Sequence, residues 1–320
     1  MNRMNRVNCW KLLKFHIMNS AVQLPVIKIA GDSICSAPDL LAIEEPLEIT
    51  LAFEDPAGGH PRLTRIQNLA VTMRTPGHDA DLTLGFLFTE GIITGPAAVK
   101  TIQHIFAPCS ENKENSIRVT LQPGVMPNLG QAERNFYTTS SCGVCGKTSI
   151  QAIRTVSALS AGNHGADLQT GDGIEPALIL SLPGRLSTQQ QVFAATGGLH
   201  AAALFNGAGD LLLVREDVGR HNALDKLVGA ALTGEEVAGS SPALSRSILL
   251  LSGRASFELV QKAAMAGIPV IAAVGAPSSL AVSLAEEFGI TLIGFLRNDR
   301  FNIYSGIRRI NMPAHESILI

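Results

Sequence analysis

Apolar runs of strand length alternate with segments of helix length between residues 247 and 295, and this alternation limits the fold more than any other feature of the chain. Strands are predicted at 247–251, 269–274 and 290–295, and helices at 256–266 and 278–288. Gly267 and Gly289 follow the two helices, where glycine commonly ends a helix. Short connections between successive elements favour a parallel sheet with right-handed crossovers. We therefore expect an α/β domain.

The sequence becomes rich in arginine, glycine and hydroxyl residues where each of these strands ends, and where a further predicted strand at 211–214 ends. The segments are 215–221, 252–256, 275–279 and 296–300. Ligands bind outside the carboxyl ends of parallel strands, and helix N-termini with guanidinium groups favour anions such as phosphate. Phe295 is a candidate to stack on a base, and Asp217 or Asp299 to accept a hydrogen bond from a guanine-type edge.

A second interpretation of these segments, as ordinary helix caps and surface arginines, stays open from the sequence alone. His200 and His221 lie in or beside the same segments. Each is better interpreted as a structural hydrogen-bonding group than as a metal ligand.

A pair of cysteines, Cys142 and Cys145, lies between glycines in the run Ser141-Cys142-Gly143-Val144-Cys145-Gly146-Lys147. Glycine makes the backbone adaptable, and a nearby cation such as Lys147 favours the thiolate, which is the reactive form. Four roles fit this pattern: a dithiol redox pair, half of a zinc site, a persulfide carrier and an inert pair. A closed zinc site needs four ligands, and no second pair of this spacing exists. From the chemistry of these residues alone, a persulfide carrier and a dithiol redox pair fit the pattern equally well.

The chain divides by composition into four parts. Residues 1–36 are expected to be a disordered extension, because the apolar patch at 10–18 within the basic stretch 1–20 is interrupted by charge and has no signal-peptide cleavage site after it. Residues 37–140 are expected to form an N-terminal α+β domain, with strands within 41–53, 69–73 and 100–122 and a helix at 78–91. Pro46 predicts an edge or a bend in the first strand. A mobile cysteine loop, a helix and a linker follow at 141–173, then the C-terminal domain at 174–320, where Ser187 and Gln190 have capping-box spacing before a helix.

Composition limits the surroundings in which the protein works. The 320 residues carry a formal net charge of −2, which does not favour a nucleic-acid surface, and no apolar run has the length of a membrane span. Five cysteines at irregular spacing do not indicate a secreted disulfide framework. We expect a cytoplasmic protein with no nucleic-acid or membrane partner.

Several longer motifs together resemble one family, the formate dehydrogenase accessory sulfurtransferases, also called the FdhD or sulfur carrier family. They span about residues 40–304 in order. The motifs are Met73-Arg74-Thr75-Pro76-Gly77-His78, Gly85-Phe86-Leu87-Phe88-Thr89-Glu90-Gly91, Cys142-Gly143-Val144-Cys145-Gly146, Gly197-Gly198-Leu199-His200-Ala201-Ala202, Arg215-Glu216-Asp217-Val218-Gly219-Arg220-His221-Asn222-Ala223-Leu224-Asp225-Lys226 and Ser252-Gly253-Arg254-Ala255-Ser256-Phe257-Glu258.

The resemblance implies a function. Such proteins take sulfur from a cysteine desulfurase as a cysteine persulfide and pass it to the molybdenum or tungsten bis-guanine-dinucleotide cofactor before it enters formate dehydrogenase. Cys142 maps to the carrier and Cys145 to an assisting or resolving thiol. The cofactor-binding stretch maps to Phe295, Leu296, Arg297, Asn298, Asp299 and Arg300, and GDP or GMP is expected to mimic the bound cofactor.

The resemblance also implies an architecture: a cytidine-deaminase-like three-layer αβα domain with a smaller N-terminal α+β domain, in a homodimer. The expected activity is that of a sulfurtransferase-type carrier rather than of a metabolic enzyme. A cofactor-binding chaperone whose cysteines are structural or redox-sensing is the alternative.

Overall fold

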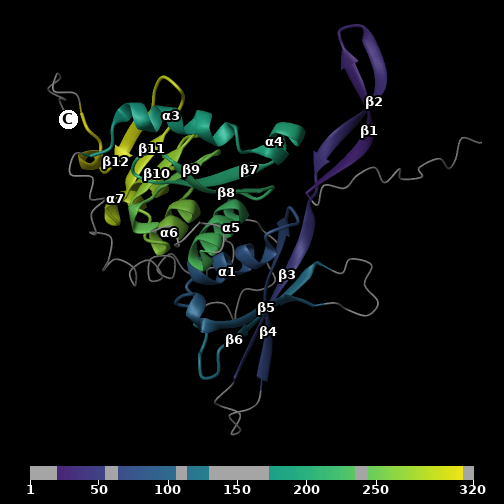
Figure 1. Cartoon of the computed structure of the whole chain (residues 1–320), viewed down its shortest axis with the longest axis vertical. Coiled ribbons are helices and arrows are strands. Elements are labelled where there is room, and N and C mark those ends of the chain that lie inside the picture. Colours follow the sequence, from purple (N-terminus) through teal and green to yellow (C-terminus); the bar gives the residue numbers. More distant parts are fainter. Residues whose placement is uncertain (1–19, 55–63, 106–113, 130–172, 235–243, 313–320) are drawn as a thin grey trace, which may run out of the picture.

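The structure, a computed structural model, describes residues 20–54, 64–105, 114–129, 173–234 and 244–312. These residues form a two-stranded ribbon, a four-stranded sheet and a six-stranded sheet. Figure 1 shows the ribbon projecting from the body and the four-stranded sheet lying beside the larger α/β part. No helix within these ranges is long and apolar enough to cross a membrane.

The ribbon pairs β1 (Ala21–Ala30) with β2 (Ser33–Ala42) in antiparallel register, with Ala21 opposite Ala42. Gly31, at φ 58°, makes the turn between them. The prediction that residues 1–36 lie outside the fold is therefore wrong for 21–36, while 1–19 lie outside the described residues. The two strands satisfy each other's backbone groups without a buried face, so their apolar residues stay exposed and give no core signal in the sequence.

The four-stranded sheet has the order β4-β3-β6-β5, and α1 (Asp79–Thr89) packs on it. Its strands are β3 (Glu45–Glu54), β4 (Thr64–Arg74), β5 (Val99–His104) and β6 (Ser116–Leu121). These elements confirm the strands and the helix predicted for this part of the chain. The prediction that Pro46 lies at an edge or a bend holds locally: β3 is internal as a whole, but at Pro46 it is paired with β4 alone. Pro46 precedes the pairing of β3 with β6, which begins at Glu48, so its missing N–H costs that ladder nothing.

The six-stranded sheet has the order β12-β11-β10-β9-β7-β8. Its strands are β7 (His200–Phe205), β8 (Leu211–Asp217), β9 (Ile248–Leu251), β10 (Val270–Ala273), β11 (Thr291–Gly294) and β12 (Asn302–Ser305). The predicted strands at 211–214, 247–251, 269–274 and 290–295 are confirmed. The sheet is mixed rather than all parallel, because β7 and β12 run antiparallel to their neighbours.

Helices cover both faces of this sheet, in three layers (Figure 1). On one face lie α5 (Arg220–Thr233), α6 (Phe257–Met265) and α7 (Ser279–Glu287), and on the other lies α3 (Pro176–Ser187). The strands alternate accordingly: in β9, Leu249 and Leu251 pack with α5–α7, whereas Ile248 and Leu250 pack with α3. The mixed α/β class is thus confirmed, and the finer likeness to cytidine deaminases stays a prediction.

The capping box predicted at Ser187 and Gln190 is wrong. Ser187 is the last residue of α3, a helix that the sequence reading missed because Pro183 lies inside it. Gln190 precedes the short helix α4 (Gln191–Thr196) and its side chain makes no capping hydrogen bond. Glu216 of β8 caps α4 instead, since its carboxylate accepts from the backbone N–H groups of Val192 at 3.2 Å and Phe193 at 2.9 Å.

Helix α1 joins the two larger parts, because it lies between the four-stranded sheet and α5 (Figure 1). The two helices touch through glycine: a Cβ at Gly85 would lie 1.9 Å from the Asp225 carbonyl oxygen, and one at Gly229 would lie 1.9 Å from that of Asp81. Buried ion pairs cross the same junction, including Arg215 Nη2 to Asp81 Oδ2 at 2.9 Å and Lys262 Nζ to Glu90 Oε1 at 2.9 Å. The two parts are therefore held together by direct backbone contact and by charge.

Candidate functional site

The ends of four strands meet at one edge of the six-stranded sheet. Strand β7 is antiparallel to both β8 and β9, so β8 runs in the same direction as β9, β10 and β11. The segments that follow these four strands therefore share the edge, as the sequence predicts. β7 begins at this same edge, with His200 paired to Asp217. We call it the carboxyl edge.

The loops at the carboxyl edge are packed against one another. The Gly275 N–H donates to the Gly253 carbonyl at 2.8 Å, and Ala255 forms a bridge with Pro277. A Cβ at Gly275 would lie 2.9 Å from the Arg254 backbone, so only glycine lets the two loops approach this closely. Ser278 caps α7 beside them by accepting from the Ala281 N–H at 3.3 Å. The loops at the carboxyl edge therefore form one packed surface and are not independent turns.

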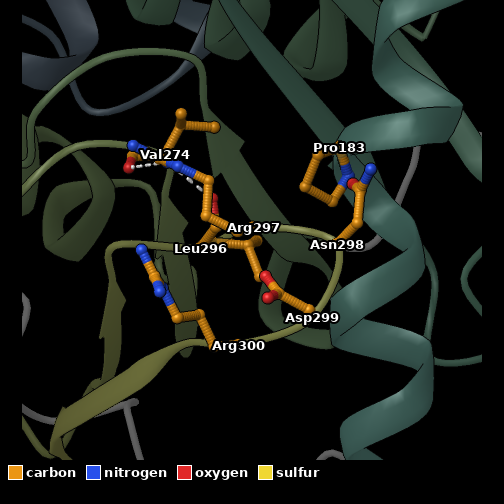
Figure 2. A pocket seen from close by; sticks show the side chains of 7 residues that line it. All are labelled: Pro183, Val274, Leu296, Arg297, Asn298, Asp299 and Arg300. Carbon is orange, nitrogen blue, oxygen red and sulfur yellow. Dashed lines mark hydrogen bonds between the residues drawn. The ribbon is translucent and has the colours of Figure 1, made fainter.

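The segment after β11 is fixed by its own backbone and by one arginine. Phe295 has φ 52°, a left-handed conformation, and its N–H donates to the Gly275 carbonyl at 3.0 Å. Arg297 donates from Nη1 to the carbonyl oxygens of Val274 at 2.6 Å and Leu296 at 2.8 Å (Figure 2). The Arg297 guanidinium therefore holds the loop in shape and is only partly available to a ligand.

A pocket of about 450 Å³ opens beside this loop, and we call it the arginine pocket (Figure 2). Its lining consists of Pro183, Val274, Leu296, Arg297, Asn298, Asp299 and Arg300. Five of the six residues predicted to bind cofactor therefore line one pocket. Leu296 is fully buried in the core, so its side chain anchors the loop, and Phe295 is 44 % exposed outside the lining. Within the described ranges, the Arg300 side chain has no hydrogen bond or ion pair, so its charge is available to an anion.

A second pocket, of about 490 Å³, adjoins the first and shares Pro183 and Val274 with it. We call it the glycine pocket. The rest of its lining comes from α3, from the segment around α4 and from the start of β7: Leu186, Gln190, Phe193, Gly197, Gly198, Leu199, His200 and Ser252. Sequence reasoning missed this pocket, because it depends on α3. The available signal was the Gly197-Gly198 pair before His200, which belongs to one of the motifs that carry the family resemblance.

Two residues assigned to this edge from the sequence have structural roles instead. Strand β8 continues to Asp217, and its alternation turns Arg215 and Asp217 toward α1 and α5. Arg215 pairs with Asp81 at the junction. Asp217 is fully buried, lies 2.7 Å from Lys226 Nζ and accepts from the Thr75 N–H at 3.1 Å. Asp217 is therefore unavailable to a guanine edge, and Asp299 remains the candidate.

Histidines lie along the same edge as a polar cluster. His221 Nε2 is 3.5 Å from Ser256 Oγ and 3.8 Å from Glu258 Oε2. The hydrogen bond with His221 outweighs burial and lowers the pKa of Glu258 to about 2. Burial, and then the charge of Arg220, lower the pKa of His200 from its usual value. The His200 ring at the glycine pocket is therefore neutral at pH 7, with one nitrogen to donate and one to accept.

Cys142 and Cys145, predicted as the reactive pair, lie outside the described residues, as does the helix expected after them. The described chain stops on one side at Leu129, which packs in the core under the four-stranded sheet. It resumes at Gly173, and Ile174 then pairs with Ile310. The structure therefore bears on the carboxyl edge and not on the cysteines.

Almost the whole chain matches known proteins. Residues 43–311 match the model of the FdhD/NarQ family. The sulfur carrier protein FdhD of Streptomyces avermitilis is 50% identical over 292 residues, covering 90% of this chain and 95% of that protein. The sulfur carrier protein FdhD of Mycobacterium tuberculosis is 46% identical over 287 residues, covering 88% and 95%.

One solved structure has the same fold. It is the crystal structure of a protein from Desulfotalea psychrophila that was described as a proposed formate dehydrogenase accessory protein. The TM-score is 0.62 at 23% sequence identity, over 91% of this chain and 100% of that one. At this identity the likeness concerns the fold alone.

Proposed function

The chain belongs to the FdhD/NarQ family, and on that premise we propose that it is a sulfur carrier protein that serves the maturation of formate dehydrogenase. The observation that carries the proposal is the 50% identity to a sulfur carrier protein over 95% of that protein's length. Its partners are a cysteine desulfurase, which supplies the sulfur, and formate dehydrogenase, which receives the matured cofactor. We propose that it works in the cytoplasm as a homodimer.

We propose Cys142 as the carrier. Its thiolate attacks the outer sulfur of the desulfurase persulfide; a new S–S bond forms on Cys142 and the desulfurase leaves as a thiolate. A glycine follows each cysteine, and the two glycines give the segment the backbone freedom that collection and delivery at different partners require.

We propose that Cys145 is the thiol that releases the sulfur from Cys142. Its thiolate attacks the inner sulfur of the Cys142 persulfide, so a Cys142–Cys145 disulfide forms and the outer sulfur leaves as HS⁻ with the electron pair. Over loading and release together, the two thiols are oxidised by two electrons and the transferred sulfur is reduced to sulfide. The sulfide replaces an oxo ligand of the client metal, and the displaced oxygen takes two protons and leaves as water. A cellular dithiol reductant then restores the thiols.

The carboxyl edge suits the client, the molybdenum bis-guanine-dinucleotide cofactor. Arg300, which has no side-chain partner among the described residues, offers its cation to a pyrophosphate, and Asp299 offers acceptors to a guanine edge in the same pocket. GDP and GMP serve as partial mimics, because they contain the same ring and phosphates.

Cys142→Ala is expected to abolish sulfur loading. After incubation with a cysteine desulfurase and cysteine, the intact mass of the wild type should rise by one sulfur atom, and that of the variant should not. Cys35→Ala is the control, because Cys35 is an exposed free cysteine on the ribbon, and it should load like the wild type. Formate dehydrogenase activity in cells should be lost with Cys142→Ala while GDP binding is kept. Retained activity would support instead a cofactor-binding chaperone with structural or redox-sensing cysteines.

Arg300→Ala is expected to weaken GDP binding about tenfold, which corresponds to about 1.4 kcal/mol and to one charge-assisted hydrogen bond at a solvent-open site. Arg297→Ala should weaken it as well, through the loop that Arg297 holds. Calorimetry measures both, and added salt should shrink the Arg300 effect. Arg308→Ala, an exposed arginine in the turn η5 (Ile307–Arg309), is the control. Equal GDP affinity in wild type and Arg300→Ala would exclude the arginine pocket as the phosphate site.

A further inference from the structure

We propose that the ribbon formed by β1 and β2 is an arm that packs on a second copy of this chain. The apolar tip of each ribbon covers an apolar patch on the four-stranded sheet of the other copy, so the dimer contains the same contact twice. The inference rests on the homodimer of the proposed function and adds to it the surface through which the two copies bind.

The tip of the ribbon carries one half of the contact, which we call the ribbon patch. Ile29 lies opposite Ile34 in the register and Ile27 lies two residues before Ile29, so the three side chains share one face. Ile27 is 64 % exposed, and Ile29 and Ile34 are each 71 % exposed. The other face carries the ion pair of Lys28 with Asp39 at 3.1 Å. An isolated two-stranded ribbon is marginal in water, so its apolar face is expected to be covered.

The four-stranded sheet carries the other half of the contact, which we call the sheet patch. Its members are Ile66, Val71 and Met73 of β4, which are 52 %, 56 % and 39 % exposed. They pair with the residues of β3 that alternate with its core residues, so they lie on the face of the sheet away from α1. Within the described residues β4 is the edge strand of this sheet. Natural edge strands are usually protected by charged side chains, so three exposed apolar ones indicate a surface that a partner covers.

The two patches of one chain lie too far apart to meet. β2 leads into β3, and Glu45 at the start of β3 lies opposite Arg74 at the end of β4, so the ribbon begins where β4 ends. At a rise of about 3.3 Å per residue, the chain from Glu45 back to Ile34 places the tip roughly 35 Å beyond that end. Figure 1 shows the ribbon pointing away from the four-stranded sheet. The ribbon patch therefore needs a sheet patch from another molecule.

A second copy of the chain supplies that sheet patch. A two-fold axis beside the joint between β2 and β3 would lay each ribbon along the four-stranded sheet of the other copy and close the contact on itself. The ribbon contributes two ten-residue strands and β4 a further eleven residues. A stable interface takes about 20–30 residues from each partner, so these elements are sufficient in size. Both patches consist of apolar residues only, which is typical of the core of a homodimer interface.

Ile29→Asp and Val71→Lys test the proposal in the full-length protein, with analytical ultracentrifugation as the measurement. Each variant replaces an exposed side chain, so folding is not at risk. The wild type should be a dimer at micromolar concentration, and each variant should weaken dimerisation roughly a hundredfold, because an unpaired charge is buried twice in every dimer. Leu280→Asp is the matched control. Leu280 is 52 % exposed on α7, outside the proposed contact, and its replacement should leave the dimer unchanged.

Mixing the Ile29→Asp and Val71→Lys proteins tests whether the two patches meet between copies. In a mixed dimer, one contact brings the new carboxylate against the new ammonium group, and the other contact is wild type on both sides. The mixture should therefore form dimers although each variant alone is monomeric.

Three results would overturn the proposal: either variant dimerising like the wild type, a mixture that stays monomeric, or a wild type that is itself a monomer. The last result would assign the two patches to a different protein. Sulfur loading of Cys142 is measured separately by mass, so the sulfur-carrier function and this contact can fail independently.

Discussion

Lys262→Met is expected to lower the free energy of unfolding by about 3–5 kcal/mol, the usual cost of removing one member of a buried ion pair. Lys262 is 4 % exposed, and its Nζ donates to Asp225 at 3.0 Å, Glu90 at 2.9 Å and Thr89 at 2.9 Å. Burial alone would lower the pKa of Lys262, but the two carboxylates outweigh it and hold the pKa above its usual value. Without the ammonium group, Asp225 keeps a buried charge, and among the described residues the Thr89 hydroxyl is the one side-chain donor left to it.

The loss should depend on pH in a defined direction. Burial already raises the pKa of Asp225, and removing Lys262 raises it further. The folded variant then holds a proton more tightly than the unfolded chain, so its stability increases as pH falls through the folded-state pKa of Asp225. The deficit relative to wild type should therefore be larger at pH 8 than at pH 5.

Urea unfolding of wild type and variant at several pH values measures both effects. Lys100→Met is the control, because Lys100 is exposed and the same substitution there should cost almost nothing. The double variant Lys262→Met with Asp225→Asn should recover part of the loss, since it removes the stranded charge. A Lys262→Met protein within 1 kcal/mol of wild type at pH 8 would contradict the assignment.

Gly229→Ala is expected to cost about 3 kcal/mol, at the upper end of the range for overpacking a core. The added methyl would lie 1.9 Å from the Asp81 carbonyl oxygen. A backbone atom inside a helix cannot rotate away, so α1 and α5 must move apart and loosen the junction. The gain in helix propensity of up to about 1 kcal/mol offsets only part of this cost.

The matched control is Gly184→Ala. Gly184 also lies inside a helix, α3, but a Cβ there would have no neighbour within 4 Å. The same substitution should therefore stabilise the protein by about 0.5–1 kcal/mol. Thermal or urea unfolding compares the two variants, and a Gly229→Ala protein as stable as Gly184→Ala would show that the helices do not meet at this glycine.

The strand and helix alternation at 247–295 predicted these strands and the edge that their ends share correctly, because burial on both faces and short connections leave little freedom there. Five of the six residues assigned to the ligand stretch line one pocket for the same reason. The exception is Phe295, which does not line the pocket. Its backbone is left-handed, a conformation that the hydrophobic periodicity of the sequence does not reveal.

Long-range contacts account for what the sequence did not predict. Arg215 and Asp217 follow a buried strand just as ligand-binding residues do, and only the packing of α1 against α5 shows that they serve the junction. α3 carries a proline in its interior, so local propensity argued against the helix that forms one wall of both pockets. The exposed ribbon has no buried face and so gave no core signal.

The α1 junction has a consequence for protein synthesis. Thr89 and Lys262, which are hydrogen-bonded across it, are separated by 173 positions in the chain. At about 5–20 residues per second, the ribosome takes roughly 9 to 35 s to make that stretch. During most of this interval α1 is complete while its partners on α5 and α6 are still being translated, so one side of the helix is left uncovered. We therefore expect ribosome-associated chaperones to bind the nascent chain. Chains that are truncated before position 262 should be degraded instead of accumulating.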